Sequence, residues 1–132
     1  MLPFRMETKL DLYRLAFWLE TFVAEIVEVD SFLFINYRAL SRDKLLAEIE
    51  VHESPAKAQR WLNIVLLNDF ITEVVGDEWA DDDSAVDEIL SVFSRVWAHQ
   101  IRAKYPKAQY SIEKINDPEY GDLGLRLIGS VQ

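Results

Sequence analysis

The stretch from Ser54 to Gly76 limits the possible folds more than any other part of the sequence. Ser54 and Pro55 form a helix-start signal, because serine is a common capping residue and proline is favoured at the first helical position. Gly76 stands where a left-handed residue would end the same helix. We therefore expect one central core helix here, with Asn63 and Asn68 on its narrower polar strip. The large apolar residues of the stretch are Trp61, Leu62, Ile64, Val65, Leu66, Leu67, Phe70, Ile71, Val74 and Val75.

A second helix is predicted near the N-terminus. Thr8 and Asp11 resemble a capping box, and an apolar stripe at helical spacing follows them. These signals predict a helix over residues 9–29. Its apolar arc is wider than a single stripe because Phe17 and Trp18 lie on the flanks, so we expect this helix to be packed on two sides.

Two more helices follow from capping signals. Ser41 is a suitable cap for a short helix over residues 42–52. Ser84, with Asp87 three residues later, predicts a longer helix over residues 84–104. The connection from the central helix to this one is short and begins with a glycine, which favours an antiparallel helix pair. The residues expected to be largely buried in this pair are Trp61, Leu66, Phe70, Ile89, Phe93, Val96 and Trp97.

The C-terminal part of the sequence alternates apolar and polar residues, as a strand does. Tyr110 and Ile112 alternate with polar residues, and the turn-forming stretch NDPEYGD separates them from a second alternating run at residues 123–127. The segment at residues 31–37 has strand-like composition but is too short for its periodicity to decide between strand and helix. We therefore predict an α+β fold for a single globular domain over residues 1–132. It is mainly helical, with three to five helices and a small C-terminal antiparallel β-hairpin.

The negative charge of the chain is concentrated in one quarter of it. Between Arg60 and Arg95 there is no Lys or Arg, while nine of the 23 acidic residues lie there. The other 14 acidic residues are matched by the 14 Lys and Arg, so this interval carries the whole net charge of -9. A concentrated acidic surface attracts basic partners and raises their encounter rate. Its candidate partner-binding residues are Asp77, Glu78, Trp79, Asp81, Asp82 and Asp83.

A metal loop and a helix cap are alternative roles for this acidic segment. A calcium loop that starts at Asp77 lacks a side-chain oxygen at Trp79 and has Asp82 where a glycine is needed, so no metal site is expected. Acidic residues at the start of the 84–104 helix complement the helix dipole, but one or two of them suffice for that role. Trp79 has two open interpretations: a cover over the ends of the two neighbouring helices, or an anchor for a partner.

No catalytic motif is found in the sequence. Histidine is the side chain best suited to act as a base near neutral pH, and the chain has only His52 and His99. HESPA lacks the second histidine of a zinc-protease motif. Arg95, His99 and Arg102 share one face of the predicted 84–104 helix and form a candidate anion-binding face. No catalytic residue and no cofactor is predicted, and enzyme activity stays an open question.

Composition also bounds the compartment and the partners. Without cysteine there are no disulfides and no thiolate metal sites. The N-terminal charges interrupt any signal-peptide core, and the longest uncharged run is far too short to span a membrane, so we expect a cytoplasmic protein. The acidic charge argues against nucleic-acid partners.

The leading hypothesis is therefore a small acidic interaction protein, such as an adaptor, an inhibitor or immunity protein, or a chaperone. It would dock a basic protein partner through residues 77–88. The alternative is a small-ligand-binding protein or an enzyme with a pocket between the helices and the C-terminal hairpin.

Overall fold

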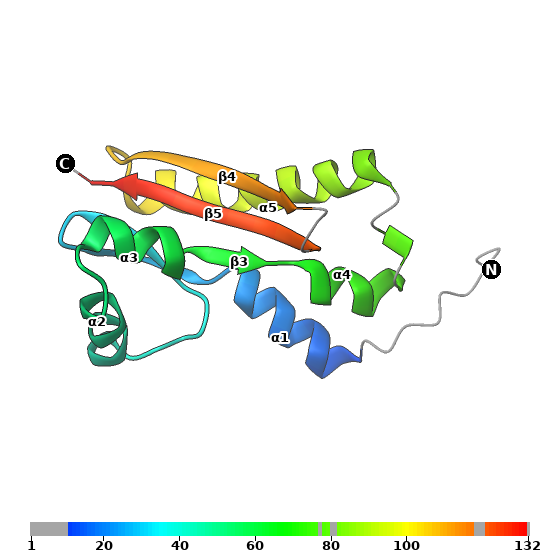
Figure 1. Ribbon diagram of the computed structural model, residues 1–132, viewed down its shortest axis with the longest axis horizontal. Coiled ribbons are helices and arrows are strands. Elements are labelled where there is room, and N and C mark those ends of the chain that lie inside the picture. The colour runs from blue at the N-terminus through cyan, green and yellow to red at the C-terminus, as the bar shows by residue number, and fades with distance from the viewer. Residues whose placement is uncertain (1–10, 77, 80–81, 118–120, 132) are drawn as a thin grey trace.

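The computed structural model describes residues 11–76, 78–79, 82–117 and 121–131. The fold is α+β, with helices on both faces of an antiparallel sheet (Figure 1). In chain order the elements are α1 (Leu12–Phe22), β1 (Glu25–Val29), β2 (Phe32–Asn36), α2 (Arg42–Glu50), α3 (Pro55–Leu62), β3 (Ile64–Leu66), α4 (Asn68–Val75), α5 (Asp83–Lys104), β4 (Gln109–Asp117) and β5 (Asp122–Ser130).

β5 is the central strand of the sheet. One of its edges pairs with β4 along the full length of both strands. Its other edge is divided, because β3 pairs with its first half and β2 meets it only at its end, where Phe32 lies opposite Ser130. β1 then continues the sheet beyond β2 as a hairpin.

Two buried amide side chains bridge the gap between β2 and β5. Asn63 Nδ2 donates to Leu33 O (2.7 Å) and Leu127 O (3.0 Å), and its Oδ1 accepts from Ile35 N (3.0 Å). One helical turn earlier, Gln59 Nε2 donates to Leu33 O (2.9 Å), and the same side chain also bonds the main chain of β5. The two amides thus take the place of the missing strand-to-strand hydrogen bonds, which buried main-chain groups require.

The sheet separates two apolar cores. The larger core lies on the face covered by α1, α4 and α5, and includes Phe22, Trp97 and the leucines of β5. The smaller core lies on the opposite face, where α2 and α3 cover β1 and β2 through Phe34, Leu45 and Ala58. On this second face β3 is not covered in the same way, and Leu66 remains 42% exposed.

The predicted central helix at residues 54–75 is wrong. The chain forms α3, then β3, then α4 over this stretch. Ser54 caps α3 as predicted, and Gly76 ends α4 with a positive φ of 84°. The helix breaks at Asn63, whose buried side chain serves the β2–β5 gap, and Ile64 and Val65 pair with β5 instead of continuing the helix. The predicted antiparallel pair of one long helix with α5 is therefore not formed by this stretch.

The predicted helix at residues 9–29 ends early. α1 stops at Phe22, and residues 25–29 form β1. Asp11 is its capping residue and accepts a bond from Arg14 N (2.8 Å), whereas Thr8 lies outside the described residues. The ambiguous segment at 31–37 is strand β2, joined to β1 by a two-residue turn in which Asp30 and Ser31 both have positive φ. Such a turn matches the twist of a hairpin.

The remaining elements agree with the sequence. α2 begins at the predicted cap Ser41, α5 covers the predicted 84–104 segment, and β4 and β5 form the predicted hairpin. The burial prediction holds fully for Trp97, which is 2% exposed. It is wrong for Trp61 (68% exposed) and Leu66. The other four residues named for this core are partly buried, namely Phe70, Ile89, Phe93 and Val96.

Candidate functional site

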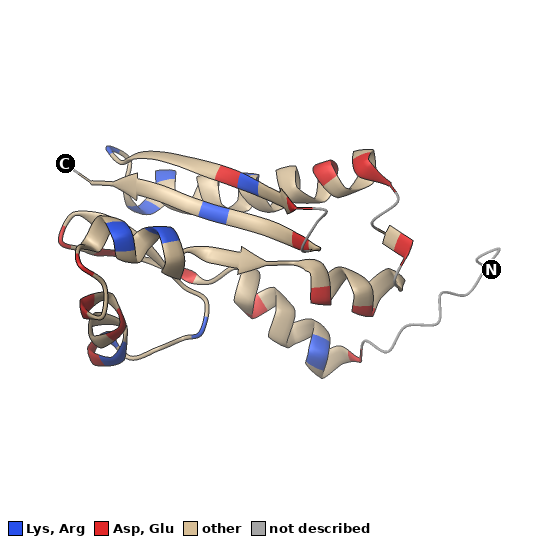
Figure 2. Cartoon of the chain, viewed as in Figure 1, with Lys and Arg blue, Asp and Glu red and all other residues tan. Residues whose placement is uncertain are grey.

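The described members of the predicted partner-binding set lie between the end of α4 and the start of α5. Glu78 is exposed and forms a single helical turn with Trp79, and Asp82 and Asp83 are exposed at the start of α5. Asp77 and Asp81 lie outside the described residues. Figure 2 shows acidic residues with few Lys or Arg at this end, whereas acidic and basic residues lie together around α2 at the other end.

The cap of α5 differs from the prediction. Asp82 is the capping residue, and its Oδ1 accepts a hydrogen bond from Ala85 N (3.0 Å). Ser84 is therefore inside the helix, and Asp87 does not bond back to a cap, because its carboxylate pairs with Lys114 Nζ (2.8 Å) on β4. Two acidic residues of the segment, Asp82 and Asp87, thus have structural roles, while Glu78 and Glu88 are exposed and neither caps a helix.

The adjoining ends of β4 and β5 add carboxylates that the sequence alone does not group with this segment. A recess of about 150 Å³ lies between these strand ends and the start of α5. Asp83 contributes from the helix, and Asp117 and Asp122 contribute from the ends of the two strands. Acidic residues far apart in sequence therefore meet because the hairpin folds back along α5. The complete lining is Trp79, Asp83, Val86, Asn116, Asp117, Gly121, Asp122 and Leu123.

Trp79 is partly buried beside this recess. Its indole Nε1 donates to Thr72 Oγ1 of α4 (2.8 Å), and its ring packs against the larger core. This geometry supports the interpretation of Trp79 as a cover over the helix ends. The same side chain also lines the recess, so part of its surface faces any group that enters there.

The other sequence-based candidates remain separate from this end. Arg95, His99 and Arg102 are all exposed along α5, and none of them lines the recess. The recess lies between the helices and the hairpin, where the alternative hypothesis places a ligand pocket. Its volume is below the roughly 300–1,000 Å³ of typical small-molecule sites.

Two features are absent from the described part of the chain. Within residues 11–76, 78–79, 82–117 and 121–131, no three His, Cys, Asp or Glu side chains are grouped so that they could hold a metal ion. Over the same residues, no helix is both long and apolar enough to cross a membrane.

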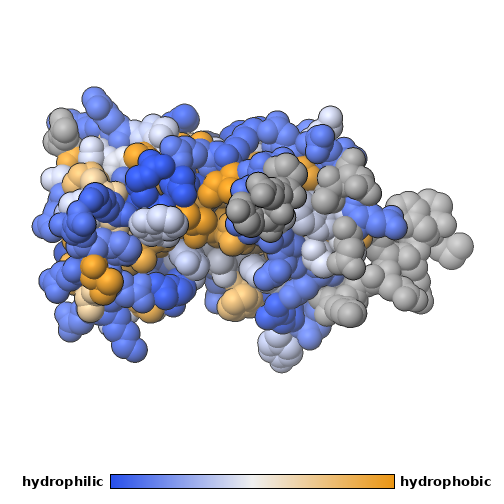
Figure 3. Space-filling view, viewed as in Figure 1, coloured by the Kyte–Doolittle hydropathy of each residue, from blue (hydrophilic) through white to orange (hydrophobic). Residues whose placement is uncertain are grey.

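A much larger groove of about 990 Å³ lies beside β3, away from the acidic recess. α1 contributes Phe17 and Trp18, and the other side contains Trp61 of α3 with Ile64 and Leu66 of β3. Phe17 is 51% exposed and Trp61 is 68% exposed, so large apolar surfaces face solvent here. Figure 3 shows apolar side chains in the middle of this face, where β3 runs in Figure 1.

A polar cluster fixes α1 as one wall of this groove. Trp18 Nε1 donates to Glu73 Oε2 of α4 (2.9 Å), and Arg14 forms an ion pair with the same carboxylate. The hydrogen bonds from Arg14 and then from Trp18 lower the pKa of Glu73, because they favour its charged form. The Trp18 ring also packs against Phe22 and Phe70, so one tryptophan joins the groove to the core.

This groove is not predicted from the sequence, although a signal for it is present there. The wide apolar arc of the 9–29 segment indicates packing on two sides, but Phe17 on its flank faces solvent beside the groove. Trp61 and Leu66, which the helical pattern places in a core, are exposed beside it as well. The signal in the sequence is that these stretches contain more apolar residues than a single buried face can hold, so some of them must be exposed.

Comparison with known proteins gives no match: no protein-family model, no curated protein and no solved structure matches this chain. The function therefore has to be inferred from the geometry of the chain itself.

Proposed function

We propose that this protein is an interaction module that docks a basic segment of a partner protein on its acidic end. One observation carries the proposal: carboxylates from the start of α5 and from the adjoining ends of β4 and β5 line one recess beside Trp79. Acidic groups from separate segments that face the same space produce a local negative potential, which steers a cationic partner toward it. The acidic net charge favours a basic protein over a nucleic acid as this partner.

The recess suits a single side chain better than a whole ligand. Its volume is about 150 Å³, and its walls combine carboxylates with the apolar surfaces of Trp79, Val86 and Leu123. A lysine or arginine has a similar division, because its stem is apolar and its head is charged. We propose that such a side chain of the partner enters the recess while exposed Glu78 and Glu88 attract the partner from a distance. A cytoplasmic location is part of this proposal, and the absence of cysteine supports it.

The test measures how fast a short, labelled lysine-rich peptide associates with the protein at several salt concentrations. The double variant Glu78→Lys, Glu88→Lys should slow association by roughly tenfold at low salt and flatten its salt dependence, because exposed charges act mainly on the encounter rate. These two residues are chosen because neither caps a helix, unlike Asp82.

The matched control is the double variant Glu28→Lys, Glu50→Lys. Both of these residues are exposed, on β1 and α2, and the change in net charge is the same. Equal slowing by the two double variants would mean that only the overall charge matters, and the proposed docking end would be rejected.

A further inference from the structure

The outer edge of β3 presents main-chain groups that the sheet does not use. Leu67 N donates to Leu123 O (2.7 Å) and Asn63 O accepts from Leu127 N (3.2 Å), so residues 63, 65 and 67 direct their polar groups toward β5. Successive residues of an antiparallel strand bond in opposite directions. The N–H and C=O groups of Ile64 and Leu66 therefore point away from β5, into the groove.

The other two outer strands are protected in ways that β3 is not. On β1, Lys104 Nζ donates to Ile26 O (2.9 Å) and Glu28 N donates to Tyr105 Oη (3.1 Å), so the end of α5 seals this edge. β4 carries the charged residues Glu113 and Lys114, which discourage pairing with another strand. β3 has neither protection, because its three residues are all apolar. The edge of β3 is therefore the one best suited to accept a further strand.

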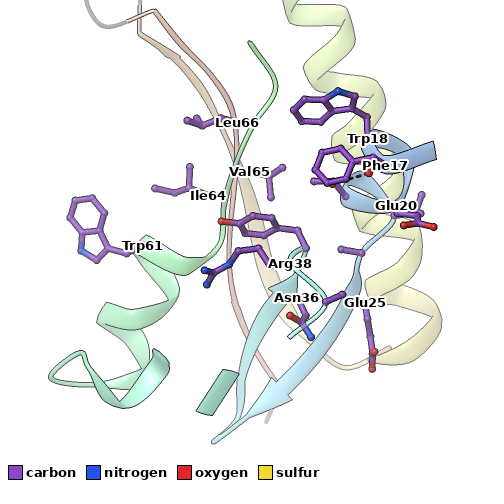
Figure 4. A pocket seen from close by; sticks show the side chains of 15 residues that line it. Phe17, Trp18, Glu20, Glu25, Asn36, Arg38, Trp61, Ile64, Val65 and Leu66 are labelled. Carbon is purple, nitrogen blue, oxygen red and sulfur yellow. Dashed lines mark hydrogen bonds between the residues drawn. The ribbon is translucent and has the colours of Figure 1, made fainter. Parts of the chain in front are cut away.

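The walls of the groove match the two sides of such a strand. Figure 4 looks onto the β3 edge, with Ile64, Leu66 and Trp61 on one side and Phe17 and Trp18 on the other. Side chains of an extended peptide alternate between the two faces of a sheet. Apolar residues of the peptide would therefore meet Trp61 and Leu66 on one face and α1 on the other.

The charges at the rim favour a basic residue in the occupant. Glu25 is paired with Lys104 (3.3 Å), and Arg38 is paired with Glu48. Glu20 lines the groove and is exposed, and it forms no ion pair within the described part of the chain. A lysine or arginine of the peptide would compensate this charge.

We propose that the β3 groove binds an extended peptide segment of a partner protein, which adds to the sheet as a strand beside β3 and places a basic residue next to Glu20. Strand addition of this kind takes its affinity from main-chain hydrogen bonds and its specificity from the alternating side-chain pockets. A second copy of the chain is a poorer occupant. Its β3 edge would be equally recessed, and two recessed edges cannot approach to the roughly 4.8 Å that strand pairing needs.

The first experiment is a selection from a displayed library of random peptides, performed in parallel on the wild type and on Leu66→Pro. Proline removes the outward N–H of Leu66 without removing a bond to β5, so the sheet should persist while strand addition is blocked. The wild type should enrich peptides with apolar residues at every second position and a Lys or Arg among them. Leu66→Pro should not enrich them.

The enriched peptides are then synthesised and their affinities measured. Binding should weaken at least roughly tenfold when alternate peptide amides are N-methylated, a change that leaves the protein intact even if Leu66→Pro folds poorly. Trp61→Ala should weaken binding, whereas Tyr13→Ala, which removes an exposed aromatic ring outside the groove, should not. Glu20→Lys should reduce binding of the basic peptide, and a peptide that carries Glu in place of its basic residue should restore it.

Three results would overturn the proposal. Enriched peptides with apolar residues spaced three and four apart would indicate a helix in the groove. Affinity that is insensitive to N-methylation would exclude main-chain pairing. A concentration-dependent dimer that Leu66→Pro abolishes would make a second copy the occupant. The variants of the acidic end, Glu78→Lys and Glu88→Lys, lie outside this groove. The proposal for the acidic end and the proposal for the β3 groove can therefore be contradicted separately.

Discussion

At the scale of single residues, two buried amide side chains connect β2 and β5 where these strands do not pair directly. Asn63 and Gln59 are 0% and 2% exposed, and together they bond main-chain atoms of both β2 and β5. An amide carries both donors and an acceptor, so it can satisfy an N–H and a C=O that face the same gap. An apolar residue of similar size at Asn63 would leave Leu33 O, Ile35 N and Leu127 O with fewer partners.

We therefore expect Asn63→Ala to lower the free energy of unfolding by at least about 2 kcal/mol, because each unsatisfied buried group costs roughly 1–3 kcal/mol. Urea denaturation of the variant and the wild type measures this difference. Asn116→Ala, at an exposed position of β4, is the control and should change stability little. An unchanged midpoint for Asn63→Ala would show that the gap between the strands closes without the amide.

At the scale of elements, α1 is held in place by few contacts outside the core. Glu73 of α4 accepts from Trp18 (2.9 Å) and pairs with Arg14, which are one turn apart on α1. The Arg14 guanidinium also lies over the rings of Phe17 and Trp18, which extends the same cluster. One carboxylate, that of Glu73, thus contacts two side chains of α1 beside the groove.

The pKa of Glu73 is lowered in the folded protein, first by its hydrogen bond from Arg14 and second by that from Trp18. A lowered pKa stabilises the fold when the pH is above the unfolded-state pKa, about 4.3 for glutamate, and this stabilisation is lost as the pH falls through the folded-state pKa. Glu73→Gln should therefore lower the free energy of unfolding at neutral pH, and should lower it less at acidic pH. Denaturation at about pH 7 and about pH 3 measures the difference, with exposed Glu50→Gln as the control. If Glu73→Gln lowered the free energy of unfolding equally at both pH values, a role for the charge of Glu73 would be excluded.

The elements that could be predicted from the sequence are those fixed by local signals. Ser41, Ser54 and Gly76 mark helix ends through their own side chains or φ angles, and the structure confirms all three. The division of the 54–75 stretch was not predictable in this way. It depends on pairing of residues 64–66 with residues 124–126, and the apolar spacing of the stretch fits a buried helix equally well.

At the scale of the whole molecule, the acidic end could be predicted as a segment but not as a surface. The sequence shows the charge of residues 77–88, whereas Asp117 and Asp122 join it only through the folding of the hairpin. The groove beside β3 combines residues from α1, the β2–α2 connection, α3 and β3, so no single stretch contains its pattern. The two proposed surfaces, one charged and one apolar, would allow a partner to be attracted first and then held.

The divided edge of β5 has a consequence for the order of folding. β2 and β3 are joined to one sheet only through β5, although β5 follows them by more than 50 residues in the chain. During synthesis, β3 has no strand partner and the β1–β2 hairpin is not joined to it until residues 122–130 leave the ribosome, and contacts of such long separation form slowly. The nascent chain should therefore expose Val65 and Leu67, which are buried in the complete fold, until the last strand arrives. Ribosome-bound chains stalled just before and just after β5 emerges would show this as a loss of protease sensitivity at β3 only in the longer chain, and protection already present in the shorter chain would contradict it.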